Sequence, residues 1–314
     1  MKVGLFYGNI AYGSRTMMEA LATAVDQNGI ESVWAEEHPA VPRPMALCDN
    51  AAPDTAGERS GETPLHEIPF PDPVVWLSQL GALTKTAKLG TGVLLLPLHN
   101  PVVLARTAAT LDDLSGGRLL LGVGLGWLKE EYNACGVSFH TRAARFEEYI
   151  HALRAAWSPE GSYVGETVRF EAIGGGPKPP DGRIPIHIGA SMSKGAQRAG
   201  RLADGFFPMP FESSTVAMAA VRAAITGDEP DWTGYALPAG VADLIRQCHD
   251  AAVAAGRRLE DVEITVTGPP SLKVAKEAAN LGVTRYLVTP PAFELSAVPA
   301  AFGRLADNFI GPLS

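Results

Sequence analysis

The segment from Leu89 to Trp127 constrains the fold of this chain more than any other. It opens with an almost uninterrupted apolar run, Leu89 to Leu96, which predicts a strand buried on both faces. Asn100-Pro101 then predicts the start of a helix, and Ser115-Gly116-Gly117 predicts its end. A second buried strand is expected from Arg118 to Val123. Because the connections are short, the segment predicts a βαβ unit with parallel strands.

Six further strands are predicted, mostly separated by helices. They are Val3–Tyr7, Ser32–Ala35, Ile184–Gly189, Asp204–Pro208, Val262–Thr267 and Arg285–Thr289. Among the helices, one is expected at roughly 212–225 and a last one at Phe293–Phe309. Eight strand and helix units in 314 residues favour a closed (β/α)₈ barrel over an open doubly wound sheet, because no early GxGxxG motif opens the chain. We treat residues 1–314 as a single barrel domain.

Two segments interrupt this pattern. From Pro39 to Pro73, after the second strand, the chain is rich in Pro, Gly, Asp, Glu and Ser and has no hydrophobic period. A loop of this length predicts a lid or binding loop, and the alternative is a disordered insertion without a role. After the fourth strand, Ser158–Gly176 holds the only alternating segment, which predicts a surface hairpin around Gly165-Glu166.

Composition restricts the partners. The formal net charge is −8, and no stripe of lysine or arginine offsets it, so nucleic acid and anionic membrane surfaces are not expected partners. No apolar stretch reaches the roughly 20 residues of a membrane-spanning helix, and no signal peptide is recognisable, which predicts a cytoplasmic protein. Cys48, Cys135 and Cys248 are widely spaced and predict reduced thiols rather than metal ligands.

The chemistry of a (β/α)₈ barrel lies at the carboxyl ends of its strands. Only one predicted end carries an acid beside an imidazole, namely Glu37-His38. The ordinary pKa of histidine suits His38 for proton transfer near neutral pH, and the alternative is a loop histidine that merely hydrogen-bonds to a neighbour. The other histidines have no metal-ligand spacing, so no metal site is expected, and His187 is interpreted as a core residue. Asp112-Asp113 and Glu130-Glu131 are interpreted as charges on helix faces.

Two further strand ends could hold a ligand. Gly122, Gly124 and Gly126 leave main chain almost free of side chains, against which a flat ligand can lie, and Trp127 follows as a stacking wall or a simple cap over the barrel mouth. The small residues from Gly189 to Ala196 form a turn at a helix start. Exposed amides and the helix dipole make such a turn a phosphate site, although turns in barrels prefer small residues in any case.

Three segments carry a family resemblance: TGVLLLPLHNPVVLARTAATLDDLSGGRLLLGVGLGW, SVWAEEH and IPIHIGASMSKGAQRAGRLADGF. With these segments the chain resembles the bacterial luciferase-like superfamily, and within it the oxidoreductases that depend on the deazaflavin coenzyme F-420. The likeness covers about residues 1–210 and extends more loosely to the end. It implies a (β/α)₈ barrel with an insertion after strand four, a homodimer, and a reduced flavin or deazaflavin across the carboxyl ends of the strands.

The resemblance also implies roles for individual residues. Glu37 and His38 match an acid and histidine pair beside the cofactor ring, and Gly92-Val93 matches a non-proline cis peptide that supports the ring. The remaining cofactor contacts are Leu95, Leu125 and Gly126 at the ring, Ala190, Ser191, Met192, Gly195 and Ala196 at the phosphate, and Glu130 at the ring or tail.

One position departs from the pattern of the sugar-phosphate dehydrogenases of this type. They have an acidic residue after the glycine that matches Gly126, whereas this chain has Trp127, which predicts an apolar or aromatic substrate wall. The expected reaction is hydride transfer between F-420 and an unidentified organic substrate, in either direction. The alternatives are a monooxygenase that uses reduced FMN and oxygen, a flavin-binding protein without turnover, and an unrelated barrel lyase or isomerase.

Overall fold

A computed structural model describes residues 1–43, 46–47, 63–210 and 232–313. Eight parallel strands form a closed barrel, because the strand order runs from β10 round to β7 and these two strands also pair with each other. The strands are β1 (Lys2–Leu5), β2 (Ser32–Ala35), β5 (Lys88–Thr91), β7 (Leu119–Gly124), β10 (Ile186–Ala190), β11 (Gly205–Pro208), β12 (Glu263–Gly268) and β13 (Arg285–Val288). The predicted (β/α)₈ barrel is therefore confirmed.

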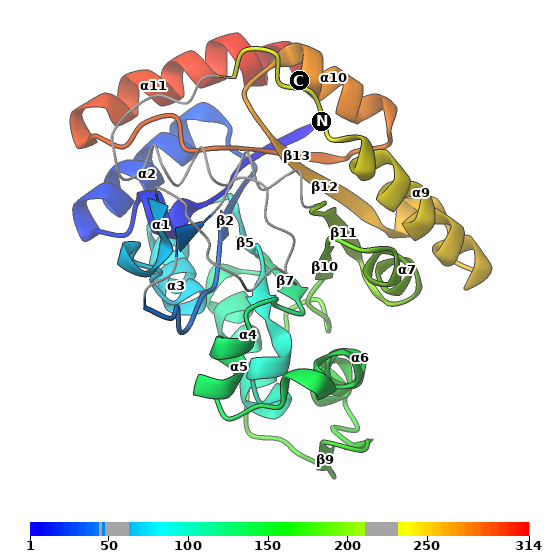
Figure 1. The fold of residues 1–314 in the computed structure, drawn as a ribbon. Coiled ribbons are helices and arrows are strands. Elements are labelled where there is room, and N and C mark those ends of the chain that lie inside the picture. Colours follow the sequence, from blue (N-terminus) through cyan, green and yellow to red (C-terminus); the bar gives the residue numbers. More distant parts are fainter. Residues whose placement is uncertain (44–45, 48–62, 211–231, 314) are drawn as a thin grey trace.

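Helices surround the barrel (Figure 1). The longer ones are α2 (Arg15–Asn28), α3 (Pro73–Leu83), α4 (Pro101–Ser115), α6 (Arg142–Trp157), α7 (Ser193–Leu202), α9 (Ala239–Ala254), α10 (Leu272–Asn280) and α11 (Val298–Leu305). The main core lies between their inner faces and the strands, so that all six residues of β7 are buried. Within the described residues, no helix is both long and apolar enough to cross a membrane.

The start and end of α4 follow directly from the sequence. The Asn100 side chain accepts hydrogen bonds from the backbone N–H groups of Val102 and Val103, and Pro101 occupies the first turn. Gly116 ends the helix in the left-handed conformation, with φ 72°. Both predicted boundaries are confirmed.

The predicted third strand, Leu89 to Leu96, is wrong as a single strand. β5 ends at Thr91, the Gly92-Val93 peptide is cis as expected, and a separate short strand β6 (Leu94–Leu95) pairs with β7. A 3-10 helix follows at Leu96–Leu98. Because nearly every residue of the run is buried, its hydrophobicity shows no period that would reveal the change of direction.

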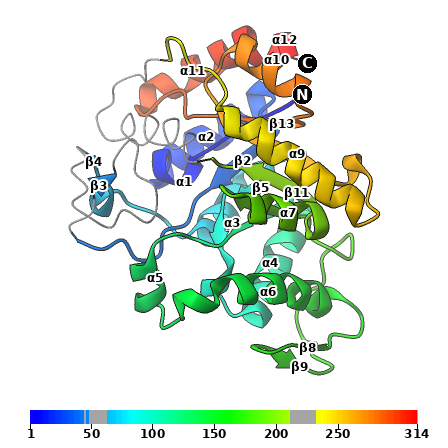
Figure 2. The same cartoon turned by 45° about the vertical axis from the view of Figure 1, so that its right-hand side comes forward.

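The two inserted segments differ in their outcome. The hairpin after the fourth barrel strand is confirmed, with β8 (Tyr163–Val164) antiparallel to β9 (Arg169–Phe170) beside α6 (Figure 2). The long loop after β2 holds only short elements among its described residues, since β3 (Ala46–Leu47) pairs with β4 (Thr63–Pro64) and a 3-10 helix follows at Leu65–Glu67. The helix expected at roughly 212–225 lies outside the described residues.

Near the chain ends, two helices differ from expectation. The last helix was expected at Phe293–Phe309, whereas α11 follows a 3-10 turn and continues into a π-helical turn at Ala306–Ile310. A short helix, α1 (Gly8–Ala11), follows β1 and was not predicted, because four residues are too few to show a period.

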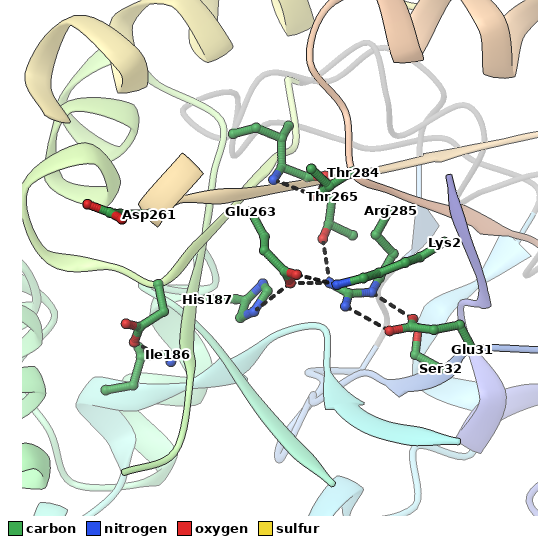
Figure 3. A network of polar contacts seen from close by, with 12 residues as sticks. Lys2, Glu31, Ser32, Ile186, His187, Asp261, Glu263, Thr265, Thr284 and Arg285 are labelled. Carbon is green, nitrogen blue, oxygen red and sulfur yellow. Dashed lines mark hydrogen bonds and ion pairs between the residues drawn. The ribbon is translucent and has the colours of Figure 1, made fainter. Parts of the chain in front are cut away.

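A polar network fills the amino-terminal end of the barrel (Figure 3). The Arg285 guanidinium lies 2.9 Å from Glu31 and 3.0 Å from Glu263, and Lys2 also pairs with Glu263. These side chains line a cavity of about 620 Å³. His187 is 1% exposed, as expected of a core residue, but its Nδ1 has no hydrogen-bond partner among the described residues. The network lies at the opposite end from the predicted chemistry, where residues of a barrel serve stability.

Candidate active site

A second apolar cluster, separate from the main core, occupies the interior of the barrel and extends to its carboxyl end. We call it the mouth cluster. Its buried members are Phe6, Tyr7, Ile10, Trp34, Ile68, Leu120, Leu128, Phe207 and Leu287, and Val41, Phe70, Trp127 and Met209 pack on it while partly exposed. Residues 41, 68 and 70 belong to the long loop after β2. The described ends of that loop therefore pack on the barrel mouth, which is the position expected of a lid or binding loop.

Buried Asn9 fixes the loop to the barrel. Its Nδ2 donates hydrogen bonds to the carbonyl oxygens of Glu36, at 2.8 Å, and Pro71, at 2.9 Å. Its Oδ1 accepts the backbone N–H of Glu36 at 3.0 Å. One side chain after β1 thus connects the residue that follows β2 to the end of the long loop, and no local sequence pattern indicates this role.

Val93 forms part of the floor of the mouth. A Cβ at Gly124 would lie 2.5 Å from one Val93 methyl, and a Cβ at Gly189 would lie 2.6 Å from the other. The two glycines, on β7 and β10, therefore make room for a partly exposed Val93 between them. Leu95 packs beside Gly126, which adopts the left-handed conformation with φ 68°. Val93, Leu95 and Gly126, which were predicted as cofactor contacts, thus lie near one another at the carboxyl ends of the strands.

His38 pairs with Glu131, a residue of the short helix α5 (Lys129–Ala134). Nδ1 of His38 lies 2.9 Å from Oε1 of Glu131, which is fully buried. The imidazole meets the Phe70 ring edge-on, with centroids 5.0 Å apart, and the Trp127 ring with centroids 6.3 Å apart. Burial alone lowers the pKa of His38, but the hydrogen bond with Glu131 and the nearby carboxylates outweigh burial and raise it.

Glu37 contacts a different histidine. Its Oε1 lies 2.9 Å from Nε2 of His99, and its Oε2 accepts the backbone N–H of Leu95 at 2.6 Å. The predicted pairing of Glu37 with His38 is therefore replaced by two separate pairs, because consecutive residues after a strand point in different directions. Burial lowers the pKa of His99, but Glu37 outweighs this effect and raises it.

Glu36 adds a third carboxylate to this end of the barrel. Burial raises its pKa to about 7, the charge of His38 lowers it and the charge of Glu131 raises it. The neighbouring Tyr7 is 3% exposed, and burial together with Glu36 raises the pKa of its hydroxyl. Glu36 and His38 are thus two groups that can exchange protons near neutral pH.

The turn between β10 and α7 has the features of an anion site. Met192 caps α7 without any side-chain hydrogen bond, and its carbonyl oxygen accepts the backbone N–H groups of Gly195 and Ala196. The amides of Ser193 and Lys194 are therefore the ones that an anion could use. A Cβ at Gly195 would lie 2.3 Å from the Cβ of Ala190, so the helix start packs tightly on the strand end. Ser191 is half-buried, Met192 is exposed and Ala196 is buried. All five predicted phosphate contacts lie in this turn.

Four active-end residues escaped the sequence analysis, namely Glu131, His99, Glu36 and Asn9. Glu130-Glu131 had been interpreted as helix-face charges, but Glu130 is exposed while Glu131 is buried. A six-residue helix is too short for periodicity to separate the two.

Leu125 accepts a hydrogen bond from the Tyr132 hydroxyl, which fixes the glycine-rich turn. Among the described residues, no group of three or more His, Cys, Asp or Glu could hold a metal ion.

Known proteins share this architecture. The chain matches the family model of the luciferase-like monooxygenases over residues 8–304. An uncharacterized protein of Mycobacterium tuberculosis is 30% identical over 307 residues, which are 96% of this chain and 98% of that protein. An F420-dependent glucose-6-phosphate dehydrogenase of Nakamurella multipartita is 28% identical over 265 residues, which are 82% of this chain and 64% of the dehydrogenase.

A solved structure supports the same fold. The monooxygenase RslO1 from Streptomyces bottropensis superposes on the whole chain with a TM-score of 0.69 at 18% sequence identity, and the match also covers 100% of that chain. The structural likeness concerns the barrel, and the family model spans nearly all of its strands. The chain belongs to the luciferase-like monooxygenase family of oxidoreductases.

Proposed function

We propose that the protein is an oxidoreductase that uses the deazaflavin coenzyme F-420 to exchange a hydride with an organic substrate at the barrel mouth. The observation that carries the proposal is the adjacency of two features. The floor around Val93 and the uncapped start of α7 meet at β10, since Gly189 contacts Val93 and Ala190 contacts Gly195. A ring lying on this floor can therefore place its phosphate tether at the helix start.

The described residues fit such a coenzyme. Gly124 and Gly189 make room for the Val93 side chain between β7 and β10, and the partly exposed Val93 offers a surface on which a flat ring can lie. A bound deazaflavin supplies the two-electron hydride chemistry, and the protein supplies binding, orientation and proton transfer. The relative from Nakamurella multipartita is named as F420-dependent, which supports this choice of cofactor.

His38 is the group that we assign to proton transfer. An imidazole can accept and release a proton, and the hydrogen bond with Glu131 and the nearby carboxylates raise the pKa of His38 against the opposing effect of burial. Phe70 and Trp127 pack around its ring and exclude water from that side. They also give the substrate pocket an aromatic wall.

The surroundings of His38 restrict the substrate. Three carboxyl groups, those of Glu36, Glu37 and Glu131, influence His38 electrostatically. Like charges repel, so we propose a neutral or cationic substrate with an apolar or aromatic part. A sugar phosphate is not expected, because Trp127 stands where the sugar-phosphate dehydrogenases carry an acid.

Fluorescence titration of the purified protein with oxidised F-420, and separately with FMN, tests the proposal. We expect F-420 to bind at least tenfold more tightly than FMN. Tighter binding of FMN, together with oxygen consumption when reduced FMN is supplied, would instead establish a flavin monooxygenase. Failure of both cofactors to bind would contradict the proposal and leave only the family assignment.

A further inference from the structure

Among the described residues, the carboxylate of Glu131 forms a hydrogen bond with one side chain, that of His38. Its Oε1 lies 2.9 Å from Nδ1 of His38, across 93 residues of sequence. Glu131 is 0% exposed, and its Oε2 is buried without a hydrogen-bond partner in the part of the chain that the structure describes. Within the described residues, His38 is thus the one side chain that forms a hydrogen bond with this buried carboxylate.

Stability alone does not account for such a residue. A buried carboxylate loses its hydration, and an apolar side chain of similar size at the same place would avoid that loss. The buried neighbours of Glu131 in sequence are apolar or aromatic: Leu128 belongs to the mouth cluster, and the Tyr132 ring packs against Phe139. The acid at position 131 therefore points to a role toward the imidazole.

The contact determines which ring nitrogen faces a substrate. A carboxylate only accepts hydrogen bonds, so it stabilises the form of the neutral imidazole that carries its proton on Nδ1. The lone pair then lies on Nε2, at the opposite edge of the ring, and no described residue hydrogen-bonds to it. Phe70 and Trp127 meet the ring at interplanar angles of 71° and 79° and restrict its rotation.

We propose that Glu131 is the positioning residue of His38, which holds the neutral ring with its proton on Nδ1 and presents Nε2 to accept a proton from the substrate. The catalytic meaning of this assignment rests on the proposed function. The tautomer itself is a property of the protein without coenzyme. Glu131 touches neither substrate nor coenzyme and acts only through His38.

The electrostatic surroundings agree with this geometry. The charged groups that face His38 are Glu131, from α5, and Glu36 and Glu37, from the segment after β2, and all three raise its pKa against the opposing effect of burial. Removing the charge of Glu131 should lower the pKa of His38. It should also lower the pKa of Glu36, which Glu131 raises.

Nitrogen-15 NMR of the histidine side chains in the wild-type protein without coenzyme tests the assignment. The signals of His38 are identified by their loss in the His38→Gln variant. At a pH above the pKa of His38, we expect Nδ1 to carry the proton and Nε2 to carry the lone pair. A neutral ring protonated on Nε2 would overturn the proposal, and the tautomer is measured in the wild-type protein itself, since His38→Gln serves only to identify the signals.

A matched pair of variants tests the charge. Glu131→Gln keeps the size of the side chain, and Glu130→Gln makes the same change at the exposed neighbour. We expect the pKa of His38 to fall by about one unit in Glu131→Gln and to stay constant in Glu130→Gln. Equal pKa values in both variants would contradict the proposal. Weak binding of F-420 would leave these NMR results unchanged. Failure of the proposed function is therefore distinguishable from failure of the role assigned to Glu131.

Discussion

The carboxylate of Glu37 lies 2.9 Å from Nε2 of His99 and holds the backbone N–H of Leu95 with its other oxygen. It thereby connects the end of β2 to the segment that follows the cis peptide Gly92-Val93. Since Val93 and Leu95 form the floor of the mouth, Glu37 supports the proposed cofactor site from below. Glu37 therefore acts on the floor of the mouth, whereas His38 is assigned to proton transfer.

Replacing Glu37 by alanine should therefore weaken both the fold and cofactor binding. The change leaves the Leu95 N–H and the His99 ring without their acceptor, which costs about 2 kcal/mol of the free energy of unfolding. Urea unfolding measures the loss, and F-420 titration measures the affinity. Glu171→Ala, at an exposed position of the hairpin after the fourth strand, is the control and should change neither. Unaltered stability in Glu37→Ala would show that the contacts of Glu37 with His99 and Leu95 do not support the floor of the mouth.

The pH dependence of the same pair has a defined sign. Glu37 raises the pKa of His99 above its ordinary value, so the stabilisation is fully present below pH 6.5 and is lost as pH rises through the raised pKa. In Glu37→Ala this loss should disappear. Unfolding curves between pH 6 and 9 for the wild-type protein and the variant measure it, and parallel pH profiles would be inconsistent with the pairing.

Gly195→Ala should disturb the proposed phosphate turn. The added Cβ would lie 2.3 Å from the Cβ of Ala190, so the helix start must move away from β10. We expect a loss of about 1–3 kcal/mol in stability and weaker F-420 binding. Gly303→Ala is the matched control in α11, where a Cβ meets nothing within 4 Å. It should stabilise the protein by about 0.5–1 kcal/mol and leave binding unchanged. Equal affinities in the two variants would argue against a phosphate at this turn.

Arg285→Met should destabilise the barrel from its other end. The guanidinium is 1% exposed, and its removal leaves Glu31 and Glu263 without their main partner. We expect a loss of about 3 kcal/mol, measured by chemical unfolding. Arg246→Met removes an exposed ion pair of α9 and should have no measurable effect. F-420 affinity should be retained in both variants, because the network lies at the amino-terminal end of the barrel, opposite the proposed cofactor site.

Low pH should lower the free energy of unfolding through His187, which lies beside Arg285 and Glu263 at the amino-terminal end of the barrel. Burial and the charge of Arg285 lower the pKa of His187 to about 4, whereas an unfolded histidine titrates near 6.5. Between these values the unfolded chain binds more protons, so the free energy of unfolding decreases as pH falls through this window, by about 3 kcal/mol in all. His187→Asn should flatten this slope, and His140→Asn, at an exposed position, should not. Identical pH slopes in the wild-type protein and His187→Asn would show that His187 does not cause this pH dependence.

The sequence predicted those parts of the molecule that local rules determine. The barrel follows from eight buried strands and the helices between them, and α4 follows from its Asn100 cap and Gly116 stop. The turn into α7 follows from the small residues between Gly189 and Ala196. In contrast, the partners of Glu37 and His38 lie 62 and 93 residues away, so no local pattern contains them. A buried acid in a six-residue helix is likewise indistinguishable from an exposed one.

The central claim is that the floor around Val93 and the start of α7 together hold one coenzyme. A crystal structure of the protein with oxidised F-420 tests this most directly. We predict that the deazaflavin ring lies against Val93 within reach of His38, and that the phosphate receives backbone N–H groups between Met192 and Ala196. A ring bound elsewhere, or a phosphate away from this turn, would contradict the account.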